Sequence, residues 1–107
     1  MIHSRPDCLT LSQGVIYLPS CLKCSVQYIG QTNRPFKERA REHLNKIDNQ
    51  KGTIGSHFNS TGHVRDHIRF QIIERVIPNS THPLLERESV WMKRFATKIP
   101  FGLNKKD

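Results

Sequence analysis

Short runs of β-branched and aromatic residues near the start of the chain predict β-strands. The first run, Gly14–Leu18, is stopped by Pro19, and the second, Val26–Gly30, ends in a glycine that polar residues follow. Because only a short loop separates the two runs, they favour an antiparallel hairpin. A third strand is predicted over residues 68–77, where apolar and polar residues alternate as in a half-buried strand.

Helical periodicity lies between the second and third of these runs and again after the third. A helix that Pro35 is suited to begin carries one apolar face, made of Phe36, Ala40, Leu44 and Ile47. A short helix is predicted around Ile54–Asn59, and a last helix from near Pro83 to about Thr97. The apolar stripe of the last helix consists of Leu84, Leu85, Trp91, Met92, Phe95 and Ala96. Residues 102–104 are expected in a closing loop.

Polar side chains interrupt the apolar faces of both long helices. Glu88 lies within the last stripe, where a carboxylate is unfavourable unless it is paired or binds a cation. Two interpretations stay open for it: an ion pair across the core, or a metal-binding carboxylate at the edge of a cleft. Arg39 and His43, neighbours on the first helix, are similarly ambiguous. Arg39 can extend to solvent, and His43 can be a hydrogen-bonded core histidine.

Taken together, Arg39, His43 and Glu88 supply a phosphate clamp, a proton-transfer group and a cation site. Those are the parts that phosphodiester cleavage requires. Magnesium suits this set because it often takes one or two protein carboxylates and completes its coordination with water and phosphate. Tyr17 and Tyr28, on the two hairpin runs, contribute only if both hydroxyls reach the same cleft. Otherwise they are ordinary strand aromatics.

Composition narrows the class of protein. The chain has 107 residues, enough for one domain, and its 17 Lys and Arg against 9 Asp and Glu give a formal charge of +8. Such an excess most often serves a polyanion, and nucleic acid is the commonest. No apolar run approaches the ~20 residues of a membrane span. Residues 1–13 have no apolar core of a secretory signal, so we expect an intracellular protein.

Cysteine and histidine spacing predicts a metal site. Cys21, Cys24, His57 and His63 form a C-x2-C-x32-H-x5-H pattern, and two thiolates with two imidazoles are an accepted tetrahedral zinc set. The zinc would be structural because no coordination position remains open for catalysis. In the alternative interpretation the histidines are polar loop residues and the thiols pack as small hydrophobic groups.

These residues also follow one another as short motifs that resemble the GIY-YIG endonuclease family. The motifs are Gly14-Val-Ile-Tyr17, Gln27-Tyr28-Ile29-Gly30, Arg39 with His43, Glu86-Arg-Glu88 with Trp91, and Gly102-Leu-Asn104. Within the family the chain is most similar to the endonuclease domain of Penelope-like retroelements. That similarity lies in the Cys-x2-Cys of the hairpin, Thr32-x-Arg34-Pro35, Ser60-Thr-Gly-His63 and Pro100-Phe-Gly-Leu-Asn104.

The resemblance implies the fold, the domain limits and the chemistry. The fold would be a small α/β (α+β) domain over residues 14–107, with a three-stranded antiparallel sheet flanked by helices, and residues 1–13 would be the end of an upstream connector. The chemistry would be one-metal hydrolysis of a DNA phosphodiester. Glu88 would hold Mg²⁺ (or Mn²⁺), and either tyrosine would activate or orient the attacking water. Arg39 would stabilise charge on the phosphate, His43 would orient or relay the proton, and Asn104 would support the site through its amide.

The resemblance further implies a nickase that supplies a 3′-hydroxyl for reverse transcription at the target. Its partners would be DNA and a reverse transcriptase domain, and its location the nucleus, where the DNA lies. Lys37, Arg41 and Lys46, on outward helix positions, are expected to bind the DNA backbone. A catalytically inert, relic or domesticated nucleic-acid-binding module is the alternative, and a zinc-stabilised protein-interaction domain is a third. The intact set of polar site residues favours the enzyme.

Overall fold

The computed structural model describes residues 14–76, 83–97, 99 and 101–104, so the predicted leading segment of residues 1–13 lies outside the described residues. The elements follow the predicted order of strands and helices. They are β1 (Val15–Cys21), β2 (Gly30–Thr32), α1 (Phe36–Asp48), α2 (Gly52–His57), a 3₁₀ turn η1 (Arg65–His67), β3 (Ile68–Arg75) and α3 (Leu84–Phe95). None of these described helices is long and apolar enough to cross a membrane.

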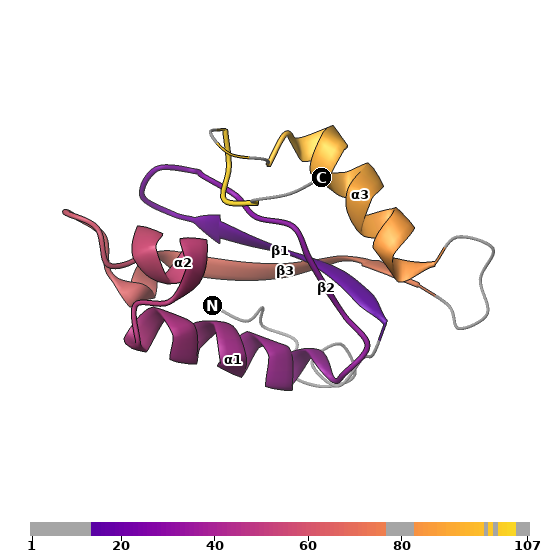
Figure 1. The fold of residues 1–107 in the computed structure, drawn as a ribbon, viewed down its shortest axis with the longest axis horizontal. Helices are drawn as coiled ribbons and strands as arrows, with labels where there is room; N and C mark the ends of the chain where they lie inside the picture. Colours follow the sequence, from indigo (N-terminus) through magenta and orange to yellow (C-terminus); the bar gives the residue numbers. More distant parts are fainter. Residues whose placement is uncertain (1–13, 77–82, 98, 100, 105–107) are drawn as a thin grey trace.

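The three strands form one antiparallel sheet, as predicted, and their order in it is β2-β1-β3 (Figure 1). The hairpin pairs Tyr17 of β1 with Gly30 of β2, and β3 lies along the other edge of β1. β2 contains only three residues, so one edge of the sheet is short. The long helices lie beyond the two faces of this sheet.

β1 is buried on both faces, which sets the layering of the molecule. Val15 and Tyr17 pack in the cluster under α1 and α2, whereas Ile16 and Leu18 pack in the cluster under α3. Alternate residues of a strand point to opposite faces, and a strand covered on both sides is therefore apolar at nearly every position. In Figure 1, α1 and α2 lie on one side of the sheet and α3 on the other.

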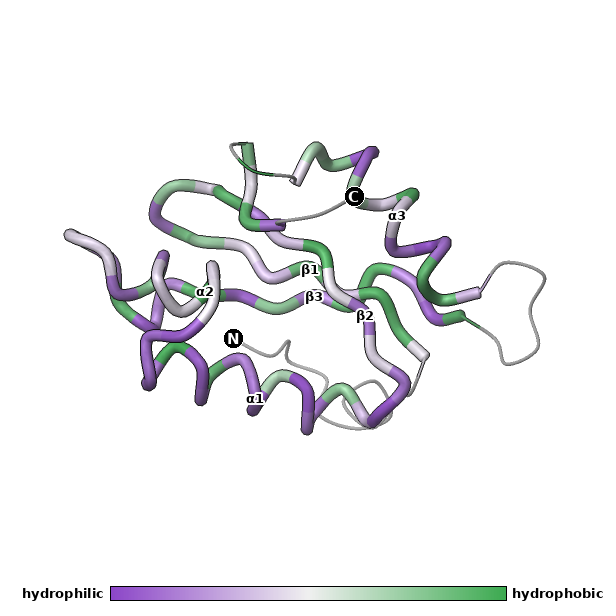
Figure 2. Tube along the Cα trace, viewed as in Figure 1, coloured by the Kyte–Doolittle hydropathy of each residue, from purple (hydrophilic) through white to green (hydrophobic). Residues whose placement is uncertain are grey.

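The first helix buries the face that its periodicity predicts. Phe36, Ala40, His43 and Ile47 are buried in α1. The side of α1 that faces away from the sheet is hydrophilic, as Figure 2 shows. The short predicted helix is observed as α2, two residues earlier than expected, and the third strand as β3. α1 thus holds a histidine against the sheet, where the sequence places an anomalous polar group.

The prediction that Pro19 ends the first strand was wrong, because β1 continues to Cys21. Proline is tolerated in a strand where its missing N–H faces no partner. The carbonyl of Pro19 accepts from the Tyr28 N–H on the β2 side, and a residue's N–H and C=O point to the same edge of a strand. The missing N–H of Pro19 therefore faces the β2 edge, where the regular ladder ends at Tyr17. The hydrogen bonds between β1 and β3 on the other edge are not affected.

The second strand was also misplaced, since it spans Gly30–Thr32 rather than Val26–Gly30. In the stretch before it, the backbone carbonyl of Gln27 accepts from Leu103 N, and the backbone of Ile29 bonds the side chain of Asn104. Tyr28 therefore lies between β1 and the C-terminal segment rather than on a strand. A sequence pattern cannot show this competition from residues at the far end of the chain.

The apolar stripe of α3 is only partly buried. Met92 is the one fully buried residue among those of α3, and Leu84 and Trp91 pack at the edge of the same cluster. Leu85, expected in the stripe, is 65% exposed, and Phe95 is 37% exposed. α3 therefore contacts the small, three-stranded sheet through a narrow surface.

Candidate active site

A cleft of about 290 Å³ opens beside the short edge of the sheet. Five separate parts of the chain line it: α1, α2 with the residue before it, α3, and two loop segments. The lining residues are Tyr28, His43, Lys46, Lys51, Gly52, Thr53, Ile54, Glu88, Met92, Leu103 and Asn104. Because β2 is so short, helices from both faces of the sheet reach the same hollow. The cleft is where predicted site residues from distant parts of the sequence meet.

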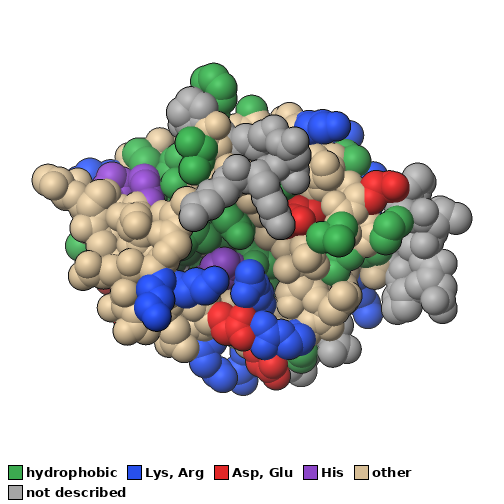
Figure 3. Space-filling model, in the orientation of Figure 1, with side chains coloured by type: hydrophobic (Ala, Val, Ile, Leu, Met, Phe, Trp, Pro, Cys, Tyr) green, Lys and Arg blue, Asp and Glu red, His purple; other side chains and the backbone are tan. Residues whose placement is uncertain are grey.

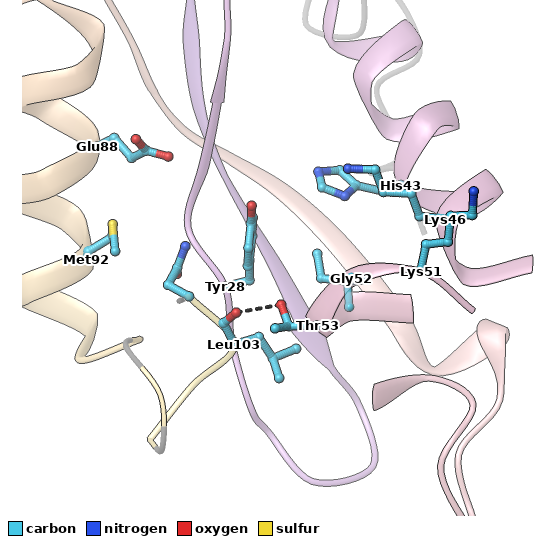
Figure 4. A pocket seen from close by; sticks show the side chains of 11 residues that line it. Tyr28, His43, Lys46, Lys51, Gly52, Thr53, Glu88, Met92 and Leu103 are labelled. Atoms are coloured by element: carbon cyan, nitrogen blue, oxygen red, sulfur yellow. Dashed lines mark hydrogen bonds between the residues drawn. The ribbon is translucent and has the colours of Figure 1, made fainter. Parts of the chain in front are cut away.

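Tyr28 stands in the middle of the cleft (Figure 4). Glu88 and Met92 of α3 lie on one side of it, and His43 and Lys46 of α1 lie on the other. The Tyr28 and His43 rings meet edge to face with centroids 5.7 Å apart. A carboxylate and an imidazole therefore face each other across a phenol.

Tyr17 lies behind this wall and is fully buried. Its hydroxyl oxygen is 2.6 Å from His43 Nε2 and accepts a hydrogen bond from Arg39 Nε at 2.9 Å. Because the guanidinium can only donate, the imidazole nitrogen is the acceptor within reach of the Tyr17 proton. Three predicted site residues thus form one hydrogen-bonded chain. Of the two tyrosines, only Tyr28 lines the cleft itself.

Burial determines the protonation of this chain. Burial lowers the pKa of His43 to about 3, and the charges of Arg39 and Lys46 act in the same direction. Burial also raises the pKa of Tyr17 and of Tyr28, while Arg39 partly offsets the rise and Glu88 adds to it. His43 and both tyrosines are therefore neutral at pH 7.

His43 Nδ1 is buried and has no hydrogen-bond partner among the described residues. His43 as a whole is 3% exposed. A buried polar atom without a partner is costly. The described protein atoms do not explain why this nitrogen is left without a partner. A hydrogen-bonded core histidine therefore accounts for Nε2 but leaves Nδ1 without a partner.

Acid should unfold the protein partly through His43. The unfolded imidazole titrates near 6.5 and the folded one near 3, so the unfolded state gains a proton first and stability falls as pH falls through this window. Between pH 7 and pH 5 we expect the wild type to lose about 2 kcal/mol more than His43→Gln. Urea unfolding at both pH values measures this difference. Glu42 and His57 titrate in both proteins, so equal losses would show that His43 is not the titrating group.

Gly30 is required by the position of Tyr17. A β-carbon at Gly30 would overlap the Tyr17 ring and lie 2.5 Å from its hydroxyl oxygen. Atoms at that separation are well inside van der Waals contact. Tyr17 and Gly30 are register partners on β1 and β2. The glycine of the second motif therefore makes room for the tyrosine of the first.

Asn104 holds the cleft from the C-terminal side. Its Oδ1 accepts from Ile29 N at 2.7 Å and its Nδ2 donates to Ile29 O at 2.9 Å. These bonds fix the residue next to Tyr28, as the predicted supporting role of the amide requires. Thr53 of α2 donates to the Leu103 carbonyl at 2.7 Å and ties the same segment to the opposite wall.

Glu42 and Arg34 are functional candidates that the sequence interpretation missed. Glu42 Oε1 accepts from Arg39 Nη1 at 2.9 Å and from Arg34 Nη2 at 2.6 Å. These bonds lower the pKa of Glu42 to about 2. Burial disfavours the charge of Arg39, but Tyr17 and Glu42 nonetheless raise its pKa. The i, i+3 spacing of Arg39 and Glu42 is the signal that could have revealed this pair.

Basic side chains gather on the α1 and α2 side of the hollow (Figure 3). Of the three predicted DNA-binding residues, Lys46 lines the cleft, whereas Lys37 and Arg41 are exposed and do not line it. Lys51, which sequence reasoning missed, lines the same wall. Arg39 is also absent from the lining residues, because its guanidinium is directed at Tyr17 and Glu42.

The predicted zinc ligands lie together in a second place, at the turn after β1. Cys21, Cys24, His57 and His63 each offer one ligand atom, and these atoms all lie within 4.8 Å of one another. Bond lengths of about 2.1 and 2.3 Å in a tetrahedral zinc site require ligand separations of roughly 3.4–3.8 Å. The Cys24 Sγ to His57 Nε2 distance, 3.4 Å, already meets this requirement.

The histidine His63 is oriented as a metal ligand needs to be. Its Nδ1 lies 3.2 Å from Ser60 Oγ and 3.4 Å from the Thr61 carbonyl oxygen. Its Nε2 is buried and has no hydrogen-bond partner among the described residues. A ligating histidine characteristically bonds a neighbouring oxygen through one nitrogen and offers the other to the metal. The donor set and the unpartnered nitrogen therefore fit zinc.

Comparisons with known proteins address the fold and the family. The GIY-YIG catalytic domain family model matches residues 13–104. The catalytic domain of the homing endonuclease I-TevI is similar, with a TM-score of 0.70 and 24% identity over 87% of this chain and 98% of that one. A glutamate-to-alanine mutant of the intron endonuclease I-TevI catalytic domain is equally similar, at 24% identity and a TM-score of 0.70, over 86% and 92%. The search of curated proteins gave no match.

Proposed function

We propose, from the premise that the chain belongs to the GIY-YIG catalytic domain family, that it is a DNA endonuclease that nicks one strand with the aid of a divalent metal ion. The observation that carries the proposal is the cleft. It brings Glu88, Tyr28, His43 and Asn104 into one hollow from four separate segments. These are residue types that phosphodiester hydrolysis uses. Lys46 and Lys51 line the α1 and α2 side of the cleft, where they would attract the phosphates of DNA.

Glu88 fits a divalent cation. It offers a carboxylate in the cleft, and its charge affects both tyrosines. One carboxylate suffices for Mg²⁺ or Mn²⁺ when water and a phosphate oxygen occupy the remaining positions. The bound ion would supply positive charge where negative charge develops on the phosphoryl oxygens.

The protein groups around the cation site would place the attacking water. The Tyr28 hydroxyl lines the cleft, so it is the phenol that would contact and orient this water. Tyr17 is fully buried and would act indirectly, by holding His43 and Arg39 in place. With its raised pKa, Tyr28 is a poor base in the free protein. It would therefore orient the water by hydrogen bonding. The scissile phosphate itself would accept the proton of the water.

In the proposed reaction, the water oxygen bonds to phosphorus and the bond from phosphorus to the 3′ oxygen breaks. The proton of the attacking water would pass to a non-bridging oxygen of the scissile phosphate as the new bond forms, and a solvent water would protonate the departing 3′ oxygen to give the hydroxyl. His43, which lines the cleft, would lie beside the scissile phosphate. Arg39 would contribute positive charge to this wall from behind Tyr17, since charge stabilisation acts strongly in a water-poor site.

Incubation of supercoiled plasmid with the protein tests the proposal. With Mg²⁺ or Mn²⁺, open-circular plasmid should accumulate before linear plasmid, and a chelator should prevent both. Gel shift in the same buffer measures DNA binding separately. Binding without cleavage under either metal would support the inert module instead, and linear product without an open-circular precursor would contradict nicking.

The lysines of the cleft wall should carry DNA affinity. We expect the double variant Lys46→Ala/Lys51→Ala to bind duplex DNA about tenfold more weakly at 0.1 M salt, with a logarithmic salt dependence shallower by about 1–2, because two phosphate contacts are lost. The matched control is Lys37→Ala/Arg41→Ala, which removes the same charge from exposed positions outside the cleft. Equal losses in the two variants would show that charge alone, and not the cleft wall, determines binding.

The retroelement role is the finer part of the proposal. The motifs shared with Penelope-like endonuclease domains support a nick that primes reverse transcription, with a reverse transcriptase domain as partner and the nucleus as the place of action. The 3′-hydroxyl that this hydrolysis leaves is the group that a polymerase extends. The assignment rests on sequence motifs, whose Cys-x2-Cys and Ser-Thr-Gly-His elements both belong to the cysteine–histidine cluster.

Zinc is the second metal of the proposal, and it has a structural role. The cluster joins the turn after β1 to α2 and to the segment that follows it, and α2 in turn forms part of the cleft. Lys23 supports the same junction by donating to the Gly62 carbonyl at 2.6 Å. Zinc bound here would hold one wall of the cleft against the sheet.

A further inference from the structure

Glu74 of β3 is bonded to two residues of α3. Its two carboxylate oxygens share the single N–H of Arg87 Nε, at 2.9 and 3.0 Å, and one of them also accepts from Trp91 Nε1 at 2.6 Å. The side chains of Glu74 and Arg87 are only 26% and 27% exposed. A partly desolvated carboxylate with donors at both oxygens is strongly oriented. We refer to these three residues as the Glu74 clamp.

A β-bulge directs Glu74 toward α3. Tyr17 pairs with Ile72, but Ile16 pairs with Glu74, so Ile73 is the extra residue between them. Without the bulge, Glu74 would share the α1 face with Ile72. With it, Glu74 is on the same face as its partner Ile16, which packs under α3. Bulges are known to redirect side chains near active sites.

The clamp matters because α3 has few other anchors. Met92 is its only fully buried residue among the described ones, and no side chain caps its first turn. Arg87 directly precedes Glu88 in α3, and Trp91 follows Glu88 by three residues, so both lie in the same turn of the helix. The clamp therefore fixes the rotation of the helical turn that carries Glu88.

We infer that Glu74 is a positioning residue for the metal-binding carboxylate of Glu88, an inference that rests on the proposed function. Side-chain atoms lie about 5–6 Å from a helix axis, so a rotation of 10–20° would move the carboxylate by about 1–2 Å. Mg²⁺ requires ligands at about 2.0–2.1 Å in near-ideal geometry. Holding the helix at one rotation keeps Glu88 directed into the cleft before the cation arrives.

Mn²⁺ binding in the absence of DNA, measured by electron paramagnetic resonance of the free ion, tests the inference. We expect Glu74→Ala to weaken Mn²⁺ binding about 5- to 10-fold, and Glu74→Gln to weaken it less, since its amide oxygen still accepts one bond. In a Glu88→Gln background, Glu74→Ala should have no further effect on Mn²⁺. Trp91 is the only tryptophan of the chain, so its fluorescence reports in the same samples whether the clamp has opened.

Ile68→Val is the matched control, because it trims a buried residue of the same strand in the cluster under α1. It lowers stability without touching α3 and should leave Mn²⁺ binding unchanged. If Glu74→Ala does not fold, Trp91→Phe removes one clamp donor and keeps an aromatic ring. Mn²⁺ binding that needs Glu88 but is unaffected in the clamp variants would overturn the inference alone. Mn²⁺ binding that does not need Glu88 would overturn it together with the proposed function.

Discussion

Replacing Glu88 with glutamine is expected to reduce plasmid cleavage at least about 1,000-fold at saturating Mg²⁺. The amide keeps the volume of the side chain but lacks the negative charge that holds the cation. A bound divalent ion contributes several kcal/mol of transition-state stabilisation, and each 1.36 kcal/mol corresponds to a factor of ten in rate. Initial rates of supercoiled plasmid loss, measured across a Mg²⁺ titration, check the prediction.

The matched control is Glu86→Gln on the same helix. Glu86 is exposed and is absent from the residues that line the cleft, so this variant makes the same change of net charge outside the site. Both variants should bind DNA slightly more tightly than the wild type, because one repulsive charge is lost. Cleavage by Glu88→Gln at the rate of Glu86→Gln would remove Glu88 from the metal site and the nuclease mechanism with it.

Removing zinc should produce the largest loss of stability. With free zinc 1,000-fold above its dissociation constant, binding stabilises the folded chain by about 4 kcal/mol. For a domain of this size that corresponds to a fall in Tm of at least about 15 °C when a chelator is added. Thermal unfolding followed by circular dichroism, with metal analysis of the same sample, measures both quantities.

Cys24→Ser separates zinc binding from packing. Cys24 is exposed, so without metal the substitution should change stability by less than about 0.5 kcal/mol. In the presence of zinc it should lower Tm nearly as far as the chelator does. A wild type that purifies without zinc, or a Cys24→Ser variant as stable as the zinc-loaded wild type, would contradict a structural zinc site.

Local pattern predicted most of the secondary structure, since burial follows periodicity. The α1 face and the alternation of β3 appear directly in the sequence. Val26–Gly30 was misplaced as a strand because its backbone bonds residues from the end of the chain. Pro19 was misread because a missing N–H costs a ladder bond only if a partner strand faces it, and the partner strands are not known from local sequence. Both errors arise from tertiary pairing, which local propensity does not encode.

The site was predictable where residue types were anomalous for their positions. His43 on an apolar face and the cysteine–histidine spacing both pointed to the clusters that the structure brings together. Lys51, Glu42 and Glu74 were missed because charged residues are ordinary at exposed or half-exposed positions. Glu74 in particular depends on a bulge, and a one-residue change of register leaves no mark in a single sequence.

The Asn104 to Ile29 pairing has a consequence for when activity can appear. It joins residues 75 positions apart, and it fixes the backbone next to the central phenol of the cleft. Contacts between such distant residues form late in folding because a long loop must close first. On the ribosome, the hairpin and α1 emerge well before residue 104. We therefore expect a nascent chain to lack nuclease activity until synthesis has passed Asn104, and a chain that stops before that residue to bind DNA without cleaving it.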